Sequence, residues 1–471
     1  MTGQTASTEL NDGAGMDKLD RGYGLHKGVL SPLETLAQSV STMAPSTSPS
    51  LTIPLVFALA GNGTWLVYLL TTVAMLLVGF CVSRFARMSA SPGSLYTYTA
   101  DTLQPSLGAV AAWALLIAYL ATGASVAGGA LYYSNVLIGQ FFSWTPPALV
   151  TLGLVFLLSG AIALRDVKLS AELMLWIEVV SVSLIVLVLI LLLIRHGLHL
   201  DLDQMKLKGV SIKGLGPALV LSMFSFVGFE SATTLGGEAR EPLKTIPRAV
   251  IQCAILAGVF FVLCAYSEVL GFQGETGKLS DSTSPLHLLA HKAGVSLLGV
   301  AIDIGAFVSM FACVLACTTA AARVLLRMAH SGLISDRFGK THPRFGTPSA
   351  GVVLSTVSML LATIALSLRG VGGTDMYGWL GSISVFGFIT SYALVAVALP
   401  FARKALGQHS LSVAVISWIT VGVLIAATMG SVYPIPEAPA LWFPYIYLGY
   451  MVIGMAWFLV RRKTIHARRQ A

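Results

Sequence analysis

The sequence predicts an all-α integral membrane protein with twelve transmembrane helices. Of its 471 residues, 55% are hydrophobic and only 11% are charged, whereas a soluble domain carries about 25% charged residues. Such a chain lacks the polar surface to face water, so lipid must be its solvent over most of its length. Apolar runs of about 17–25 residues, long enough to cross a bilayer, recur along the whole chain. Runs of this length fit helices rather than the short alternating segments of a β-barrel.

The predicted spans follow one another without a linker that would separate two folded domains. We expect them near residues 34–59, 65–85, 107–139, 147–164, 170–194, 215–237, 247–271, 296–325, 349–367, 376–400, 412–431 and 442–460. This divides the chain into four parts. They are a disordered cytoplasmic tail (1–30), spans 1–5 (31–200), spans 6–10 (201–405), and spans 11 and 12 with a short basic tail (406–471).

The distribution of charge predicts the orientation in the membrane. With a cytoplasmic N-terminus, most of the 29 Lys and Arg residues fall in cytoplasmic segments, as the positive-inside rule requires. We therefore expect a multi-pass protein of the cell membrane (plasma or inner) with both termini in the cytoplasm. The basic residues Arg461, Arg462 and Lys463 would then lie at the inner leaflet, and we expect no binding to nucleic acid.

Span 1 has a clear start and is then interrupted. Ser31, Pro32 and Glu34 follow the pattern of a capping box with proline at the first helical position. Residues 43–50 read MAPSTSPS, which places two prolines and four hydroxyl side chains at mid-membrane depth. The simplest alternative to a real break is a kinked helix in which the hydroxyls satisfy the freed backbone groups.

Span 6 is interrupted at the matching place of the second half. Residues 224–231 read FSFVGFES, and further threonines and glycines follow at 233–237. Paired interruptions in two halves indicate the binding site of an inverted-repeat transporter. A helix that stops at mid-membrane presents free N–H groups at one broken end and free C=O groups at the other. A zwitterion fits both ends.

Several motifs resemble those of the amino acid–polyamine–organocation permeases. They are FVGFES at 226–231 with EAREPLKTIPRA at 238–249, ARVL at 322–325 with MAHSGLI at 328–334, HPRFGTP at 342–348, and RFAR at 84–87 with GSLYTY at 93–98. The resemblance implies the leucine-transporter fold, in which spans 1–5 and 6–10 are inverted repeats and spans 11 and 12 are peripheral. It also implies secondary transport by alternating access, usually of amino acids, with proton coupling or exchange.

The resemblance further implies a substrate site at the two interruptions. Counting back from Pro54, the family's Gly-Ser-Gly stretch falls on residues 47–49, so both glycines are replaced and Pro49 offers no N–H donor. Either the neighbouring hydroxyls replace that donor or the substrate lacks a carboxylate. We expect the substrate to meet Pro45, Ser46, Thr47 and Ser48 in span 1 and Phe224, Ser225, Phe226 and Val227 in span 6.

Two of the family's gating positions have counterparts in this chain. Phe224 falls where the family has an aromatic gate over the substrate, and Cys317 falls on a second gating position in span 8. Ordinary packing is the alternative for both side chains. All five cysteines lie in apolar segments and are expected to be buried thiols.

Four acidic residues at membrane depth are candidates for coupling, because ionisable groups there are costly and mark function. Glu230 matches a family carboxylate and is expected to sense protons or to gate; a structural cap on free N–H groups is the alternative. Glu178 lies one turn before Ser181, which stands where a related transporter has a lysine in place of sodium, so Glu178 is a second coupling candidate. We expect Glu268 and Asp303 to lie near the outer interface and to be solvated.

Charged residues also follow spans 6 and 8 on the predicted cytoplasmic side. They are Glu238, Arg240, Glu241, Lys244 and Arg248 after span 6, and Arg323, Arg327 and Arg337 after span 8. Ion pairs between the two groups would close the path to the cytoplasm. The alternative is a solvated loop whose positive charge only sets the orientation.

These observations predict a secondary active transporter that moves a neutral or apolar amino acid by alternating access, coupled to protons. The first alternative is an exchanger of amino acids or amines such as polyamines. A channel or a transporter-like nutrient sensor is the alternative from a different class. Sodium stays open as the coupling ion, with Thr318 and Thr319 as oxygen donors. We expect no enzyme, no metal cofactor and no other cofactor, and a monomer or homodimer.

Overall fold

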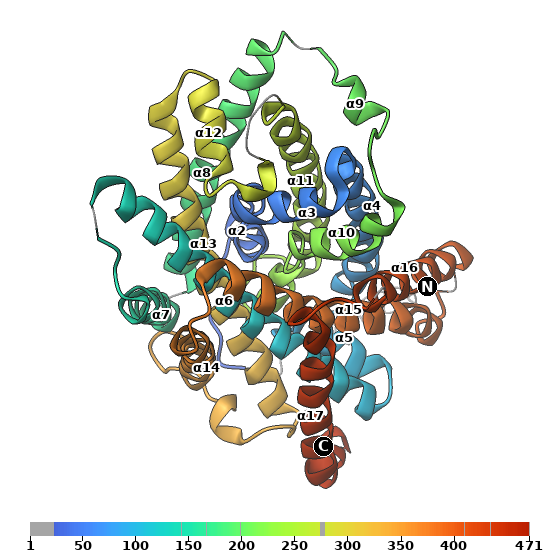
Figure 1. The fold of residues 1–471 in the computed structure, drawn as a ribbon. Coiled ribbons are helices and arrows are strands. Elements are labelled where there is room, and N and C mark those ends of the chain that lie inside the picture. The colour runs from blue at the N-terminus through green and yellow to red at the C-terminus, as the bar shows by residue number, and fades with distance from the viewer. Residues whose placement is uncertain are drawn as a thin grey trace, which may run out of the picture.

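The protein is described from a computed structural model, which covers residues 23–470 apart from 143, 166, 198, 274–277, 409 and 434. Helices make up nearly all of it (Figure 1). The first part of the chain forms α2 (Pro32–Met43), η1 (Ser48–Thr52), α3 (Ile53–Ala60), η2 (Gly61–Gly63), α4 (Thr64–Ala86), α5 (Ser94–Thr102), α6 (Pro105–Phe141), α7 (Ala148–Arg165) and α8 (Val167–Arg195).

The second part of the chain forms the remaining elements. They are α9 (Leu202–Met205), α10 (Ile212–Phe224), η3 (Ser231–Leu235), α11 (Pro242–Gly271), η4 (Leu279–Asp281), α12 (Pro285–Lys292), α13 (Ser296–His330), η5 (Asp336–Gly339), α14 (Ser349–Leu368), α15 (Gly373–Ala405), α16 (Leu411–Val432), η6 (Ala440–Trp442) and α17 (Phe443–Gln470).

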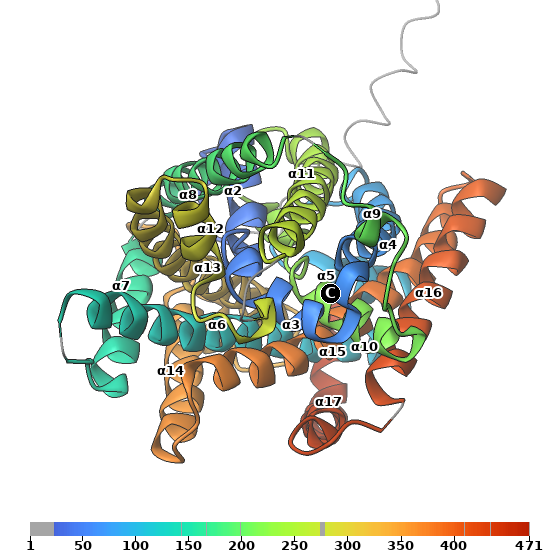
Figure 2. The same ribbon diagram turned by 45° about the horizontal axis from the view of Figure 1, so that its top comes forward.

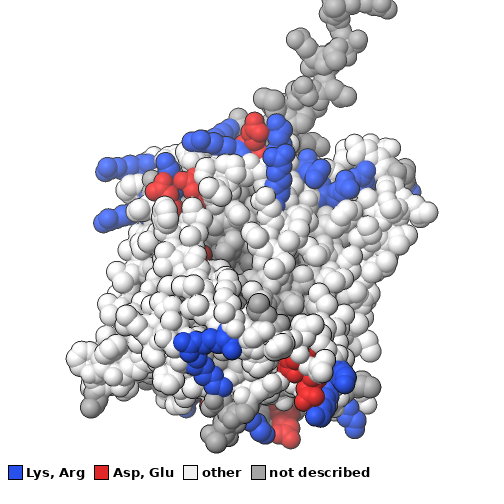
Figure 3. Space-filling model, turned by 90° about the horizontal axis from the view of Figure 1, so that it is seen from above, with Lys and Arg blue, Asp and Glu red and all other residues white. Residues whose placement is uncertain are grey.

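The outside of the bundle is built for lipid. Ten stretches of the described chain are long and apolar enough to cross a membrane. Figure 3 shows the charged side chains gathered toward two opposite ends, with a broad uncharged band between them. Large apolar side chains such as Leu157, Trp176 and Val259 are about two-thirds exposed, an arrangement that water would penalise and hydrocarbon favours. The prediction of an all-helical membrane protein is confirmed.

The centre of the bundle is formed by helices from both halves of the chain. Helix α6 packs along α13 and α15, and α4 packs along α11, while α7, α14, α16 and α17 lie at the periphery in both views (Figures 1 and 2). Glycines allow the central backbones to approach closely. A Cβ on Gly387 of α15 would lie 2.5 Å from the Ala114 carbonyl oxygen of α6.

The predicted interruption of span 1 is confirmed. The capping box is present, with the Ser31 hydroxyl accepting from Glu34 N at 3.3 Å and Ser31 N donating to the Glu34 carboxylate at 2.6 Å. Helix α2 then ends at Met43, where Ala44 adopts a left-handed conformation with φ of 47°. The chain restarts as the π-helical η1 at Ser48 and continues into α3.

The interruption of span 6 is confirmed as well. Helix α10 ends at Phe224, and helical structure resumes only in η3 at Ser231. Gly228 lies between them with φ of +86°, and a Cβ there would come within 2.2 Å of the Thr42 side chain. Both the positive φ and the close approach require glycine at this position.

Both chain ends lie at the same end of the bundle. Leu30 is fully buried and pairs with the segment after η3, through Leu30 N to Glu238 O (3.1 Å) and Arg240 N to Leu30 O (2.9 Å). At the C-terminus, Arg468 of α17 donates to Asp336 at 2.7 Å. We call this end the terminal face. Helix α11 leaves it at Pro242 and ends 30 residues later beneath α12, at what we call the opposite face.

The expectation of a disordered tail through residue 30 is wrong for its last part. Residues 1–22 lie outside the described residues, but Leu25 and Leu30 are buried. Burial of these side chains and the backbone pairing of Leu30 offset the entropy of ordering the segment.

Replacing Gly228 with alanine is expected to destabilise the protein. The left-handed backbone alone should cost about 1–3 kcal/mol, and the overlap with Thr42 should add to this cost. Thermal unfolding of the purified protein in detergent should show a lower Tm. The control is Gly153→Ala in α7, where a Cβ meets nothing within 4 Å. An unchanged Tm for the Gly228 variant would contradict the need for this conformation.

Candidate functional site

A polar seam joins the two interrupted spans. The hydroxyls of Thr42 and Ser231 lie 2.7 Å apart, and Ser231 also donates to the Gln38 carbonyl at 3.0 Å. The next residue, Ala232, donates its backbone N–H to the Ser39 hydroxyl at 2.9 Å. These contacts hold α2 against η3 and satisfy backbone groups that the interruptions leave without helical partners.

At the break of span 1, several buried hydroxyls have no partner. Those of Ser41, Ser46 and Thr47 make no hydrogen bond among the described residues, although all three side chains are at most 1% exposed. A buried hydroxyl without a partner costs about 1–3 kcal/mol, so such groups call for an explanation. Ser46 and Thr47 belong to the predicted substrate site, together with the buried Pro45 and Ser48.

The predicted gate Phe224 lies at the end of α10 against α15. Its ring makes an edge contact with Tyr377, with centroids 5.2 Å apart. A Cβ on Gly381 would meet the Phe224 ring at 2.6 Å, so the glycine makes room for the ring. Tyr377 in turn bonds the Thr52 hydroxyl at 2.7 Å. Phe224 is thus coupled through one tyrosine to the helix that follows the span 1 break.

The other predicted residues of span 6 have different surroundings. The Ser225 hydroxyl lies 3.0 Å from the Tyr68 hydroxyl of α4. The Phe226 ring packs against Phe261 of α11, with centroids 5.1 Å apart, so this side chain belongs to the helix packing. Val227 is buried at 3% exposure.

Glu230 is buried at the centre of the bundle and is fully hydrogen-bonded. Its carboxylate accepts from the Tyr119 hydroxyl of α6 at 2.9 Å and from the Tyr392 hydroxyl of α15 at 2.6 Å. Glu230 therefore ties the broken span to two continuous helices. It makes no side-chain cap bond to the start of η3.

Glu178 occupies a second buried position, between α8 and α13. Both of its carboxylate oxygens accept from the Ser309 hydroxyl, at 2.9 and 3.0 Å. One turn along α13, the Cys313 thiol donates to the Thr42 carbonyl at 3.0 Å and lies 3.9 Å from the Cys317 thiol. The predicted gate Cys317 is fully buried, and these contacts link Glu178 to the break of span 1.

The two threonines considered as sodium ligands follow on α13. The Thr318 hydroxyl donates to the Val314 carbonyl at 2.8 Å, and the Thr319 carbonyl accepts from Arg323 at 3.0 Å. Both side chains are buried. Their oxygens keep further acceptor capacity.

The expectation that Glu268 and Asp303 are solvated is wrong, since they are 0% and 1% exposed. Asp303 accepts from Ser284 at 2.5 Å, His287 at 2.9 Å and Gln140 at 3.3 Å. Helix α12, which carries His287, packs on α13 and α11 at the opposite face, and its contacts with Asp303 help to remove that carboxyl from solvent.

The terminal face is closed by a buried ion pair. Arg323 of α13 makes two bonds of 2.6 Å to Glu238, and both side chains are at most 2% exposed. Arg327 reaches Asp101 of α5 at 3.2 Å. Of the charges expected to form a network, Glu238 and Arg323 therefore meet, whereas Glu241 pairs with Lys244 at the surface.

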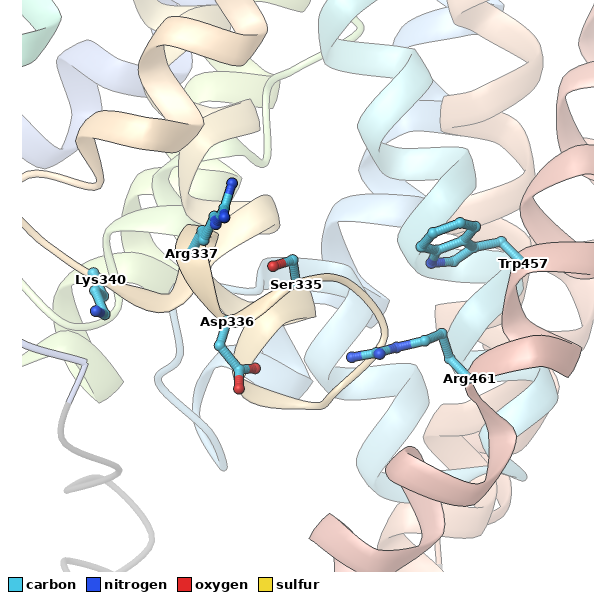
Figure 4. A pocket seen from close by; sticks show the side chains of 6 residues that line it. All are labelled: Ser335, Asp336, Arg337, Lys340, Trp457 and Arg461. Atoms are coloured by element: carbon cyan, nitrogen blue, oxygen red, sulfur yellow. The ribbon is translucent and has the colours of Figure 1, made fainter.

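A cavity of about 440 Å³ on the terminal face lies apart from the two breaks (Figure 4). It is lined by Ser335, Asp336, Arg337 and Lys340 around η5 and by Trp457 and Arg461 of α17. Trp457 and Arg461 also donate to carbonyls of the segment that follows α13, those of Leu333 (2.8 Å) and Gly332 (3.2 Å). These bonds fix α17 to the bundle, and part of the basic tail predicted at the lipid is therefore bound to the protein itself.

Sequence reasoning missed the partners of the site residues. Tyr68, Tyr119, Tyr377 and Tyr392 all place a hydroxyl at the breaks or on Glu230. The available signal was a tyrosine within an apolar span, because a buried phenol needs a hydrogen-bond partner.

Comparison with known proteins identifies relatives among transporters. A family model described as "Amino acid permease" matches residues 44–470. The branched-chain amino acid permease BcaP of Bacillus subtilis (strain 168) is 22% identical over 366 residues, which are 73% of this chain and 74% of that protein. The low-affinity putrescine importer PlaP of Escherichia coli (strain K12) is 26% identical over 308 residues, 63% of this chain and 66% of that protein.

The fold also matches solved structures. The manganese transporter of Eremococcus coleocola superposes with a TM-score of 0.61 over 93% of this chain and 95% of that chain, at 11% sequence identity. At this identity the match shows the fold alone, and that fold is the leucine-transporter fold expected from the sequence.

Breaking the ion pair of the terminal face should be costly. Glu238→Gln leaves the Arg323 guanidinium buried without its counter-charge, so the free energy of unfolding should fall by about 3–5 kcal/mol. Thermal unfolding in detergent measures the effect. The matched control is Glu241→Gln, which breaks the exposed pair with Lys244 and should change the Tm little. Equal Tm values for both variants would contradict a closing role for the buried pair.

Proposed function

Because the chain belongs to the amino acid permease family of secondary transporters, we propose that it moves a neutral or apolar amino acid by proton-coupled symport. The observation that carries this proposal is the pair of interrupted spans with unpartnered hydroxyls between them. Ser46 and Thr47 are buried beside the free ends of α2 and η1, and their hydroxyls donate to no group among the described residues. A substrate carboxylate would accept from these hydroxyls, which replace the amide donor that Pro49 lacks.

The ammonium group of the substrate would meet the other broken helix. Helix α10 ends at Phe224, so the last carbonyls of α10 carry the negative end of its dipole. A protonated amine is attracted to such an end. The zwitterion would then span the two breaks, with the Ser46 and Thr47 hydroxyls on one side and carbonyls around Phe224, Ser225 and Val227 on the other.

Apolar surroundings favour a neutral or apolar side chain. The ring of Phe224 packs on Tyr377 and would act as the gate over the substrate. The related BcaP of Bacillus subtilis carries branched-chain amino acids by its name, which agrees with this choice. Phe226 would contribute its backbone only, since its ring packs on α11.

Proton coupling would involve the buried carboxyls. Glu230 is held by hydroxyls from α6 and α15, so a change in its charge would alter bonds to two continuous helices at once. Glu178 would act as a second group through Ser309 and the contacts of α13 to Thr42. Sodium is the alternative ion, with Thr318 and Thr319 as ligands.

We further propose twelve crossings with a five-plus-five inverted repeat. The apolar stretch Pro32–Ala86 has 55 residues, enough for two crossings that turn at Gly61–Gly63. The interrupted span made of α10 and η3 would supply another crossing. Helix α2 packs on η3 and α3 packs on α10, as two repeats of opposite orientation would arrange their first helices.

Orientation follows from the excess of basic residues. The terminal face, with the basic end of α17, would be cytoplasmic and the opposite face external. The buried pair of Arg323 and Glu238 then closes the cytoplasmic side. We propose a cell-membrane protein that acts as a monomer or homodimer.

Exchange of an amine is the second candidate. The observation that favours it is Pro49, which removes a backbone donor for a carboxylate. Buried carboxyls such as Glu230 would bind the amine. The putrescine importer among the relatives agrees with this reading.

Uptake into liposomes should distinguish these functions. We expect gradient-driven accumulation of a radiolabelled neutral amino acid when an inward proton gradient is imposed. Glu230→Gln should abolish the dependence on the gradient, because the group can no longer change its charge. Glu172→Gln on the exposed side of α8 is the control. Uptake only into vesicles preloaded with substrate would favour exchange, and no flux of any amino acid or amine by folded protein would contradict the transport proposal.

Substrate binding should weaken when the unpartnered hydroxyls are removed. Ser46→Ala and Thr47→Val each delete one donor worth about 0.5–1.5 kcal/mol, which raises the apparent Kd by roughly 2- to 10-fold. Binding is measured by scintillation proximity with the labelled substrate. Ser159→Ala is the control, because that hydroxyl bonds its own helix α7 at Phe156. Unchanged affinity in both site variants would place the substrate elsewhere.

A further inference from the structure

Glu268 differs from the other buried carboxyls of the bundle in having no partner. It is 0% exposed, and neither carboxylate oxygen has a hydrogen-bond partner. Glu230 accepts from two phenols, Glu178 from a serine, and Asp303 from three donors. A carboxyl kept only for structure would be bonded like these three.

Glu268 lies beside the substrate site proposed above. It is three residues from the end of α11, on the half of the bundle that leads to the opposite face. It lies close enough to Tyr68 of α4 and to Cys264 of its own helix for electrostatic interaction with them. The Tyr68 hydroxyl is 3.0 Å from that of Ser225 at the span 6 break. Tyr68 is therefore near both Glu268 and the break.

Three titratable groups at this end, those of Lys292, Tyr266 and Asp201, are bonded elsewhere. Lys292 of α12 donates to the Gly271 carbonyl at 2.5 Å. The Tyr266 hydroxyl accepts from Asp201 N at 2.9 Å, and the Asp201 carboxylate bonds Gln273. No cation among the described residues forms an ion pair with Glu268, whose oxygens are both without partners.

An ionised carboxylate in these surroundings is not stable. Removing it from water costs several kcal/mol, and no hydrogen-bond donor or cation among the described residues offsets that cost. The group must therefore hold a cation in this closed conformation. A proton is the cation that needs no additional space, and Glu268 is the carboxyl among the four that most needs one.

We propose that Glu268 is the outer proton-binding group of this transporter. In the closed state its carboxyl keeps the proton on oxygen. When the opposite face opens, water enters, the O–H bond breaks, the proton passes to water and the carboxylate remains; the reverse step loads it. Tyr68 and Ser225 connect this change to the substrate. The proposal rests on the transport function proposed above and adds a residue to its coupling.

Proton movement and substrate exchange separate this role from others. In proteoliposomes with a trapped pH dye, substrate added to the wild type should drive proton movement. Glu268→Gln should lose that movement and keep exchange of labelled for unlabelled substrate at the wild-type rate; Glu172→Gln should keep both. Proton movement at the wild-type rate in Glu268→Gln would overturn the proposal, and so would loss of exchange in folded protein, since the residue would then hold substrate.

An infrared measurement tests the proton without any transport. The wild-type spectrum minus that of Glu268→Gln should contain the carbonyl stretch of a protonated carboxylic acid, and its absence would overturn the proposal. If the wild type moves no substrate, the proposed transport function is contradicted. The infrared band still tests whether Glu268 carries a proton, because it does not depend on transport. Glu268→Met, of similar volume, provides the same difference spectrum should the glutamine variant not fold.

Discussion

The whole site depends on one constraint, that backbone N–H and C=O groups within a bilayer must find partners inside the protein. Two spans stop at mid-depth, and the seam between Thr42 and Ser231, with Ser39 on Ala232 N, supplies part of what the missing helical turns would have supplied. Gly228 permits this approach because a side chain there would collide with Thr42. The breaks can therefore exist only where the two halves meet. A site built on free helix ends must lie at the interface between halves, which is also the interface that alternating access has to rearrange.

Closure of the two faces has different physical origins. At the terminal face, Arg323 and Glu238 form a buried bidentate ion pair. Separating the two charges is costly unless water reaches them, because each would be left buried without its partner. At the opposite face, Phe224 and Tyr377 meet through rings, and Asp303 is covered by α12 through neutral donors and His287. Contacts of the second kind are individually weaker and tolerate rearrangement. The described conformation thus has one face held by charge and one by packing and hydrogen bonds.

Much of the fold follows from the sequence, because lipid imposes long apolar spans and because paired polar, small-residue interruptions in two of them indicate broken helices. The breaks at residues 43–50 and 224–231 were predictable on that ground. The partners of Glu230 were not, since Tyr119 and Tyr392 lie 111 and 162 residues away along the chain. The burial of Asp303 was missed because its position within a span indicates only its depth in the membrane, whereas the short helix α12, which lies outside the spans, covers it through His287. Burial by a helix that is distant in the sequence leaves no periodic pattern of apolar residues from which it could be predicted.

Hydrogen bonding divides the polar residues of the interior by role. Glu178, Glu230 and Asp303 accept hydrogen bonds from side chains of neighbouring helices. Ser46, Thr47 and Glu268 have no hydrogen-bond partner among the described residues, and buried polar groups of this kind call for an explanation. Ser46 and Thr47 lie at the break of span 1, and Glu268 lies near Tyr68, which bonds Ser225 at the break of span 6. Two hydroxyls can donate to a substrate anion and one carboxyl can take a cation, so the unsatisfied groups have the complementary chemistry that coupled uptake of a zwitterion and a proton requires.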